Sequence, residues 1–139
     1  MTMERTLAIL KPDCVQRNLI GKVIDRIESA GFKIVRMKMV HLTRAMAEGF
    51  YEVHNGKPFF AELVNFMTET PCVVAVLEKN NCVEAWRKTM GATNPQNAEP
   101  GTIRRDLAEN MGRNIVHGSD STENAEREID FFFSHSELL

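Results

Sequence analysis

The chain has 139 residues, of which 43% are hydrophobic and 26% are charged. This length leaves little room for a second core and this composition excludes disorder, so we expect one globular domain over residues 1–139. With 17 basic and 19 acidic residues, the formal net charge is −2. That charge argues against a protein that coats nucleic acid or a membrane through its overall electrostatic field.

The cysteines and the apolar runs indicate where in the cell the protein is located. Cys14, Cys72 and Cys82 show no zinc-ligand spacing, and their scattered positions favour free thiols in a reducing environment. The first residues lack a secretion-signal pattern, and the apolar run 72–77 is far too short to cross a bilayer. We expect a cytoplasmic protein with no membrane association.

Apolar runs and helical spacings alternate along the first half of the chain. The run 6–10 predicts a buried strand that ends in a turn at 11–13. Apolar residues at helical spacing over 20–27 predict a helix that Gly31 terminates. Alternation over 35–39 predicts a strand with an apolar face (Val35, Met37, Met39) and a wetter one.

The next elements follow the same logic. Thr43 is suited to cap a helix whose apolar side extends to Val53, and residues 54–58 break it. A second apolar helical face covers 60–67. The run 72–77 is apolar on both faces, which suits a central strand covered above and below.

The last elements are two helices and a short strand. Val83, Trp86 and Met90 predict a helix, and Ser121 is suited to cap a final helix with an apolar inner face over 125–133. A short fourth strand is expected within 114–118. This order favours a ferredoxin-like α/β sandwich, a four-stranded antiparallel sheet with helices on one face. A doubly wound parallel sheet is the alternative.

Residues 91–116 lack a sustained apolar period and contain two prolines, which is typical of a loop that serves a site. Five basic residues lie in or beside this loop: Arg87, Lys88, Arg104, Arg105 and Arg113. Lys11, at the end of the first strand, is placed to join them. Clustered guanidinium groups with threonines between them match the oxygens of a polyphosphate. A solvated loop with surface ion pairs is the alternative interpretation.

His117 closes the loop, beside Gly118 and just before the last helix. Glycine there would let a substrate approach the backbone. Glu128 lies about two turns along that helix, on the side from which it can point back to the loop. A carboxylate on one ring nitrogen would leave the other nitrogen as a nucleophile or base. A structural histidine and a solvated glutamate are the alternatives. His41, His54 and His135 lack such neighbours and are interpreted as surface or packing residues.

The chain has neither the GxxxxGK[ST] nor the GxGxxG phosphate-binding sequence, so any nucleotide would bind without a glycine-rich cradle. Phe59 and Phe60 follow a turn. One of them is needed for the core, and the other is available for a base to stack on.

These motifs resemble those of the nucleoside diphosphate kinase family. The resemblance runs from Arg5 to Phe133 and is carried by six segments: Glu4-Arg5-Thr6, Lys11-Pro12-Asp13, Pro58-Phe59-Phe60, Gly91-Ala92-Thr93-Asn94-Pro95, Pro100-Gly101-Thr102-Ile103-Arg104 and Asn114-Ile115-Val116-His117-Gly118-Ser119-Asp120-Ser121. It implies a ferredoxin-like fold. It also implies ping-pong transfer of the γ-phosphoryl group of a nucleoside triphosphate, mainly ATP, to a nucleoside diphosphate through a phosphohistidine.

The resemblance also implies residue roles. His117 would be the nucleophile, with Ser119 and Glu128 orienting it and Tyr51 bonding close to it. Lys11 would meet the sugar hydroxyl and the transferring group. The remaining nucleotide contacts would be these: Phe59 on the base, Arg87, Thr93 and Arg104 on the phosphates, and Asn114 on the sugar 3′-hydroxyl.

Mg²⁺ would bridge the phosphates, and the sequence shows no carboxylate cage for it. A homo-oligomer is implied, and because the chain stops soon after Phe133 both a tetramer and a hexamer stay open. Two departures from the family pattern are Cys14 and Arg105, where small residues are common.

Two other function classes remain to be weighed. A nucleic-acid-binding module is disfavoured by the net negative charge and by a single Tyr and a single Trp. An inactive relative that acts as a scaffold is disfavoured because Lys11, Arg104 and His117 are all present.

Overall fold

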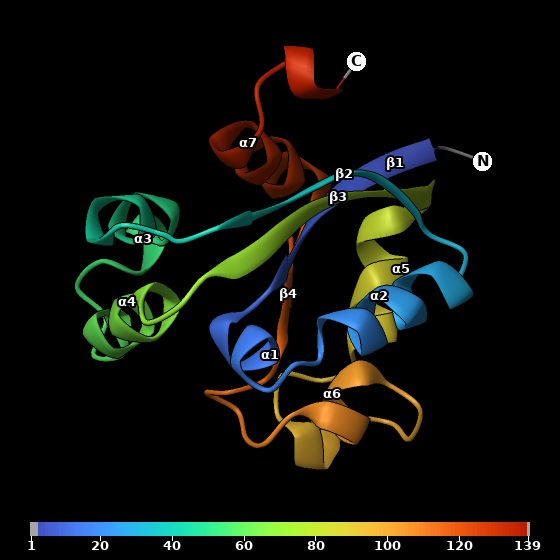
Figure 1. Ribbon diagram of the computed structural model, residues 1–139, viewed down its shortest axis with the longest axis horizontal. Coiled ribbons are helices and arrows are strands. Elements are labelled where there is room, and N and C mark those ends of the chain that lie inside the picture. Colours follow the sequence, from blue (N-terminus) through green and yellow to red (C-terminus); the bar gives the residue numbers. More distant parts are fainter. Residues whose placement is uncertain (1–2, 139) are drawn as a thin grey trace.

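In the computed structural model, which describes residues 3–138, four antiparallel strands form one sheet in the order β2-β3-β1-β4 (Figure 1). The strands are β1 (Met3–Leu10), β2 (Lys33–Val40), β3 (Cys72–Asn80) and β4 (Val116–Gly118). All three neighbouring pairs run antiparallel. The predicted ferredoxin-like sheet is confirmed, and the parallel alternative is excluded.

Seven α-helices and three short 3₁₀ turns occur among residues 3–138. The helices are α1 (Pro12–Gln16), α2 (Ile20–Ser29), α3 (Arg44–Phe50), α4 (Phe60–Thr68), α5 (Cys82–Met90), α6 (Ile103–Leu107) and α7 (Thr122–Phe132). The 3₁₀ turns are η1 (Glu52–His54), η2 (Pro95–Asn97) and η3 (Ser136–Leu138). No helix within this described part is long and apolar enough to cross a membrane.

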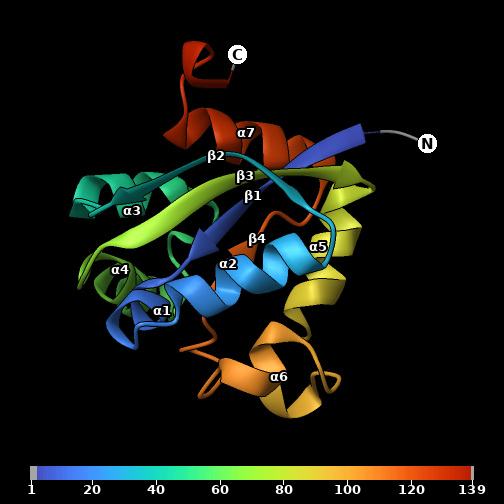
Figure 2. The same ribbon diagram turned by 45° about the vertical axis from the view of Figure 1, so that its right-hand side comes forward.

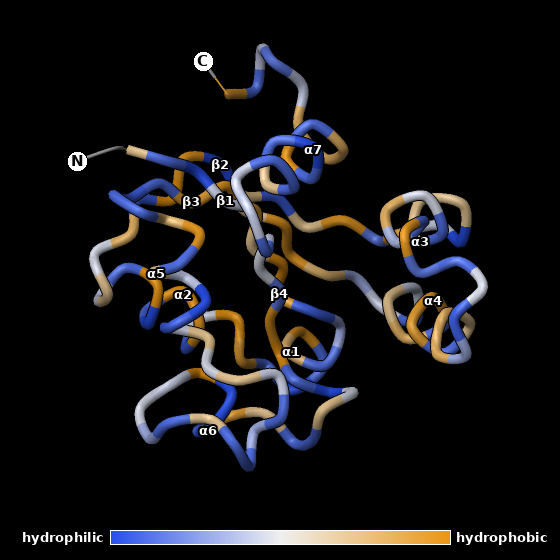
Figure 3. Tube along the Cα trace, turned by 180° about the vertical axis from the view of Figure 1, so that it is seen from behind, coloured by the Kyte–Doolittle hydropathy of each residue, from blue (hydrophilic) through white to orange (hydrophobic). Residues whose placement is uncertain are grey.

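Helices cover both faces of the sheet, so the expectation of helices on one face is wrong (Figures 1 and 2). Side chains alternate along β3. Val73, Ala75 and Leu77 pack with α2 and α5, whereas Val74 and Val76 pack with α3, α4 and α7. A strand that is apolar on both sides needs cover on both sides. In Figure 3 the helices change colour around each turn, as amphipathic helices do.

Strand β2 differs from the prediction in which face is buried. Met37 and Met39 are 46% and 55% exposed, whereas Lys38 lies over the Phe133 ring and pairs with Glu137. A bulge between Ile34 and Arg36 adds one residue to this edge strand. An added residue reverses the faces of all side chains after it, so the two methionines lie on the face opposite Val35 and remain uncovered.

Two of the predicted helix N-caps are confirmed. Thr43 accepts a hydrogen bond from the amide of Met46, and Ser121 accepts one from the amide of Asn124, as expected of N-caps. Gly31 follows α2 at a φ of +90°.

Three local predictions are wrong. Residues 12–16 form α1 where a turn was expected, because Pro12 stands at a first-turn position that favours helix initiation. The loop 91–116 contains η2 and α6, which Asn94 and Thr102 cap. Val53 lies in η1 and is 69% exposed, since α3 ends at Phe50.

Candidate active site

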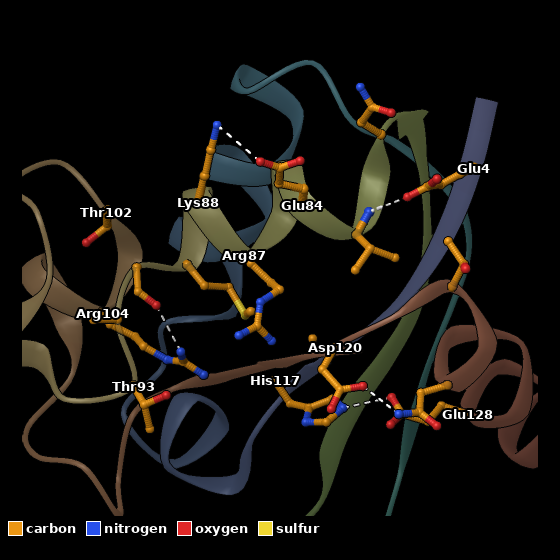
Figure 4. Close-up of a pocket in the computed structure, with 18 of the residues that line it drawn as sticks. Glu4, Glu84, Arg87, Lys88, Thr93, Thr102, Arg104, His117, Asp120 and Glu128 are labelled. Carbon is orange, nitrogen blue, oxygen red and sulfur yellow. Dashed lines mark hydrogen bonds and ion pairs between the residues drawn. The ribbon is translucent and has the colours of Figure 1, made fainter. Parts of the chain in front are cut away.

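A cavity of about 1360 Å³ opens where α3, α5, β4, α7 and the segment around α6 meet (Figure 4). Six of the residues predicted for the site line it: Tyr51, Arg87, Thr93, Arg104, His117 and Glu128. These residues come from chain segments far apart in sequence, and the fold brings them to one cavity.

His117 is fixed by a carboxylate from α7. Its Nε2 lies 2.9 Å from Oε1 of Glu128, and the same oxygen accepts a 2.8 Å hydrogen bond from the Ser119 hydroxyl. The Ser119 hydroxyl in turn accepts a 3.4 Å hydrogen bond from the amide of Leu7 in β1. Glu128 and Ser119 are buried, which limits the freedom of this chain of hydrogen bonds. The Nδ1 atom of His117 has no hydrogen-bond partner among residues 3–138.

Aromatic rings line the side of the cavity near α3. The Phe50 ring meets the His117 imidazole edge-on at 5.7 Å between centroids. The Tyr51 hydroxyl is buried without a hydrogen-bond partner in the described chain. Burial, followed by the charges of Cys72 and Glu128, raises the pKa of Tyr51 well above its usual value. The hydroxyl therefore stays protonated and is a donor available to a ligand.

Arg104 joins the walls of the cavity. Its guanidinium donates to the carbonyls of Gly91, Asn114 and Val116 at 3.0, 3.3 and 2.7 Å. Burial, with the charge of Arg87 second, lowers the pKa of Arg104 to about 10, which leaves it charged at neutral pH. Figure 4 shows Arg87 and Arg104 extending into the same region as His117. The two guanidinium groups place positive charge beside the imidazole.

Lys11 and Asn114, which are not among the lining residues of the cavity, are hydrogen-bonded to each other. Lys11 Nζ donates to Asn114 Oδ1 at 2.8 Å, and Asn114 Nδ2 donates to the carbonyl of Thr93 at 3.2 Å. Burial and the charge of Arg104 lower the pKa of Lys11 to about 8, against an opposing effect of Asp13. This link ties the end of β1 to the loop that carries Thr93.

Phe59 lies at the margin of the site and is 47% exposed. Its ring is 5.2 Å from that of His54, which is in turn 6.3 Å from that of Tyr51. His54 packs between these two rings, as expected of a packing residue, and it also lines the cavity. His41 and His135 are exposed, as expected.

Two further sequence interpretations change. A Cβ on Gly118 would collide with the Trp86 indole and with Met90, so this glycine admits a core tryptophan rather than a substrate. Arg105 donates to the carbonyls of Gln96 and Ala98, which stabilises the loop. Cys14, the other departure, is fully buried.

No group of three or more His, Cys, Asp or Glu side chains within residues 3–138 is placed to hold a metal ion. Asp120 contributes a carboxylate to the cavity wall. Nucleotide kinases generally use a divalent metal. These residues fit an ion that is bound mainly by nucleotide phosphates, since such ions keep several waters and need few protein ligands.

A histidine with one nitrogen held and the other available, beside fixed guanidinium groups, is the arrangement of a phosphotransferase. The family model described as nucleoside diphosphate kinase matches residues 4–138. A nucleoside diphosphate kinase of Geotalea daltonii is 60% identical over 99% of this chain and all of its own length. One from Geobacter sulfurreducens is 56% identical with the same coverage.

Solved structures agree with this match. The nucleoside diphosphate kinase of Aquifex aeolicus superposes with a TM-score of 0.96 at 41% identity, covering 99% of this chain and 100% of its own. That of Halobacterium salinarum, in complex with CDP, gives 0.94 at 42% identity, covering 99% and 92%. The chain belongs to the nucleoside diphosphate kinase family, whose members are phosphotransferases that work by a ping-pong mechanism.

Proposed function

We propose that this chain moves the γ-phosphoryl group of a nucleoside triphosphate, mainly ATP, to a nucleoside diphosphate, with Nδ1 of His117 as the carrier. The observation that carries this assignment is the 2.9 Å contact between Nε2 of His117 and Glu128, which leaves Nδ1 as the nucleophilic nitrogen. The domain assigned to this activity is residues 1–139.

In the first half-reaction, the Nδ1 lone pair forms a bond to the γ-phosphorus. The bond from phosphorus to the β–γ bridging oxygen breaks, and the departing diphosphate keeps that electron pair. In the second half-reaction a terminal oxygen of another diphosphate attacks the phosphohistidine, and the nitrogen recovers its lone pair. Glu128 accepts from Nε2–H and stabilises the positive charge that develops on the ring, while Ser119 holds Glu128.

The cationic residues stabilise charge on the transferring group. Arg87, Arg104 and Thr93 are assigned to the phosphates because they line the cavity around His117. Lys11 and Asn114 are assigned to the sugar hydroxyls and the phosphoryl group, which would replace their mutual hydrogen bond.

The aromatic residues take the remaining roles. Phe59 offers an exposed face to the base, and stacking tolerates any base. Tyr51, which lines the same cavity as His117, offers its unpartnered hydroxyl.

Magnesium is the divalent ion we assign to this reaction. When bound, it neutralises charge on the β- and γ-phosphates. Asp120, one of the carboxylates that line the cavity, would hold this ion, directly or through water.

A cytoplasmic location is supported by the three cysteines, which are all unpaired and buried. A homo-oligomer, either a tetramer or a hexamer, is supported by the edge strand β2 with its exposed methionines.

The test is phosphorylation by γ-labelled ATP with Mg²⁺. We expect an acid-labile label on one histidine that added nucleoside diphosphate discharges. His117→Ala removes the label, whereas His135→Ala, a change at an exposed histidine, keeps it. Labelling of the His117→Ala protein at the wild-type level would place the nucleophile elsewhere.

A further inference from the structure

The backbone just before His117 contains a strained turn. Ile115 has a φ of +74°, a region that β-branched residues rarely adopt, and its side chain is fully buried. The amide of Val116 donates to the carbonyl of Asn114 at 2.8 Å, which closes a γ-turn around Ile115. Turns of this kind with a positive central φ are rare and strained, and they persist only where surrounding contacts hold them.

Two contacts from one short segment hold this turn. Oδ2 of Asp13 accepts a 3.0 Å hydrogen bond from the amide of Ile115, and the amide of Lys11 donates to the Ile115 carbonyl at 2.8 Å. Asp13 is 1% exposed, and its Oδ1 has no hydrogen-bond partner in the described chain. A buried carboxylate with one unpartnered oxygen is costly, which indicates that its other oxygen serves a purpose.

The held turn lies between two parts of the site. On one side, the Asn114 side chain bonds Lys11 and the loop at Thr93. On the other side, Val116 begins β4, in which His117 pairs with Ile9. Arg104 bonds the carbonyls on both sides of the turn. A change in the turn would therefore move Asn114, Arg104 and His117 relative to one another.

We propose that Asp13 is a positioning residue: by accepting the Ile115 amide it holds the strained turn that sets Asn114 and His117 in register. Asp13 acts through the backbone and contacts no substrate. This inference rests on the proposed function, because its consequence for catalysis assumes that His117 carries the phosphoryl group.

The experiment compares Asp13→Asn with Asp13→Leu. An asparagine oxygen can still accept from the Ile115 amide, whereas leucine has a similar size and no acceptor. The matched control is the same pair of substitutions at Asp25, an exposed residue of α2. Single-turnover labelling by γ-labelled ATP gives the rate of His117 phosphorylation, and the ATP dependence of that rate separates binding from chemistry.

We expect Asp13→Leu to lower the phosphorylation rate by roughly ten- to a hundredfold, while Asp13→Asn stays within about threefold of wild type. The Asp25 variants should match wild type. A folded Asp13→Leu protein with the wild-type rate, or an Asp13→Asn protein as slow as the leucine variant, overturns the proposal. If the leucine variant does not fold, the rate of the asparagine variant and the amide measurement that follows decide.

A readout independent of activity is hydrogen exchange at the Ile115 amide, followed by NMR. We expect this amide to be strongly protected in the wild-type protein and in Asp13→Asn. Exchange as fast as that of neighbouring loop amides overturns the inference even if the enzyme is active. Conversely, a protected Ile115 amide in a wild-type protein that takes no label on histidine rejects the proposed function while the role of Asp13 in the turn stands.

Discussion

Glu128 is the residue on which the orientation of His117 depends. Its Oε1 accepts from both His117 and Ser119, and its Oε2 lies 4.0 Å from Arg127. Because Oε1 takes part in both hydrogen bonds, a rotation of the carboxylate would break them together. The imidazole is thus held in a single tautomer, with its other nitrogen toward the cavity.

Glu128→Gln tests the charge of this group with little change in its shape. We expect the rate of His117 phosphorylation to fall about 100-fold, because the amide stabilises the developing ring charge less well. Single-turnover labelling with γ-labelled ATP measures this phosphorylation rate. Glu126→Gln, at an exposed position of the same helix, provides the control. Equal rates for the two variants would contradict the role of Glu128.

Lys11 gives the site a dependence on alkaline pH. Burial, together with Arg104, lowers its pKa to about 8, and Asp13 partly opposes this. The ammonium form predominates below that pH and the neutral amine above it. We therefore expect kcat/KM to fall as the pH rises through about 8. Lys11→Arg should remove this decline, since a guanidinium stays charged. The exposed change Lys22→Arg should leave the profile as it is, and an unchanged decline in Lys11→Arg would exclude Lys11 as its source.

The sequence predicted the residues of the site better than their surroundings. His117 and Glu128 could be proposed from the sequence. His117 closes the long loop, and Glu128 lies about two turns along the helix that follows it. Their contact became a firm expectation only through the family resemblance. The role that we propose for Asp13 could not be predicted in this way. Asp13 matters because residues 102 positions apart in the chain meet at Ile115, and such a contact leaves no local pattern.

At the scale of elements, β4 packs closely against α5 at Gly118. The Trp86 indole lies where a side chain at position 118 would be, and its Nε1 donates to the carbonyl of His117 at 3.1 Å. Gly118 is required because any Cβ there would push β4 away from α5. The position of β4, which carries His117, thus depends on a glycine that the sequence had suggested was for substrate access.

Gly118→Ala is expected to destabilise the fold by about 1–3 kcal/mol, because overpacking forces the tryptophan or the strand to move. Gly21→Ala is the matched control. It lies in α2 with nothing near its added Cβ, and we expect it to be neutral or to stabilise by up to about 1 kcal/mol. Urea unfolding measures both. Equal stabilities of the two variants would show that the contact with Trp86 adapts without cost.

Sequence patterns predicted the longer elements and the three-residue β4 but missed the shortest helices, for identifiable reasons. The nine-residue β3 and ten-residue α2 repeat their apolar pattern enough to be read. The five-residue α1 and α6 are too short for periodicity, and capping and proline position determine them instead. The strand β2 was predicted correctly, but the face on which Met37 and Met39 lie was not. The bulge moves them to the other face, and a bulge depends on the pairing with β3.

At the scale of the whole molecule, the sheet has two very different edges. One edge is β4, which has only three residues, and the other is the eight-residue β2. Met37 and Met39 are exposed on one face of β2, at the edge of the sheet. Natural proteins protect long edges that carry apolar side chains, since such edges pair with other chains. A second copy of the chain is the partner we propose for this edge.

Replacing Met37 and Met39 together by lysine tests this assembly. We expect the wild-type chain to sediment as a homo-oligomer and the double variant to shift toward smaller species, because charged side chains on an edge oppose strand pairing. Met111→Lys is the control, since Met111 is similarly exposed but lies in the loop before β4. Sedimentation velocity at several protein concentrations gives the masses. If the double variant keeps the wild-type mass, the subunits meet through another surface, and if the control dissociates as well, added charge rather than the β2 edge is the cause.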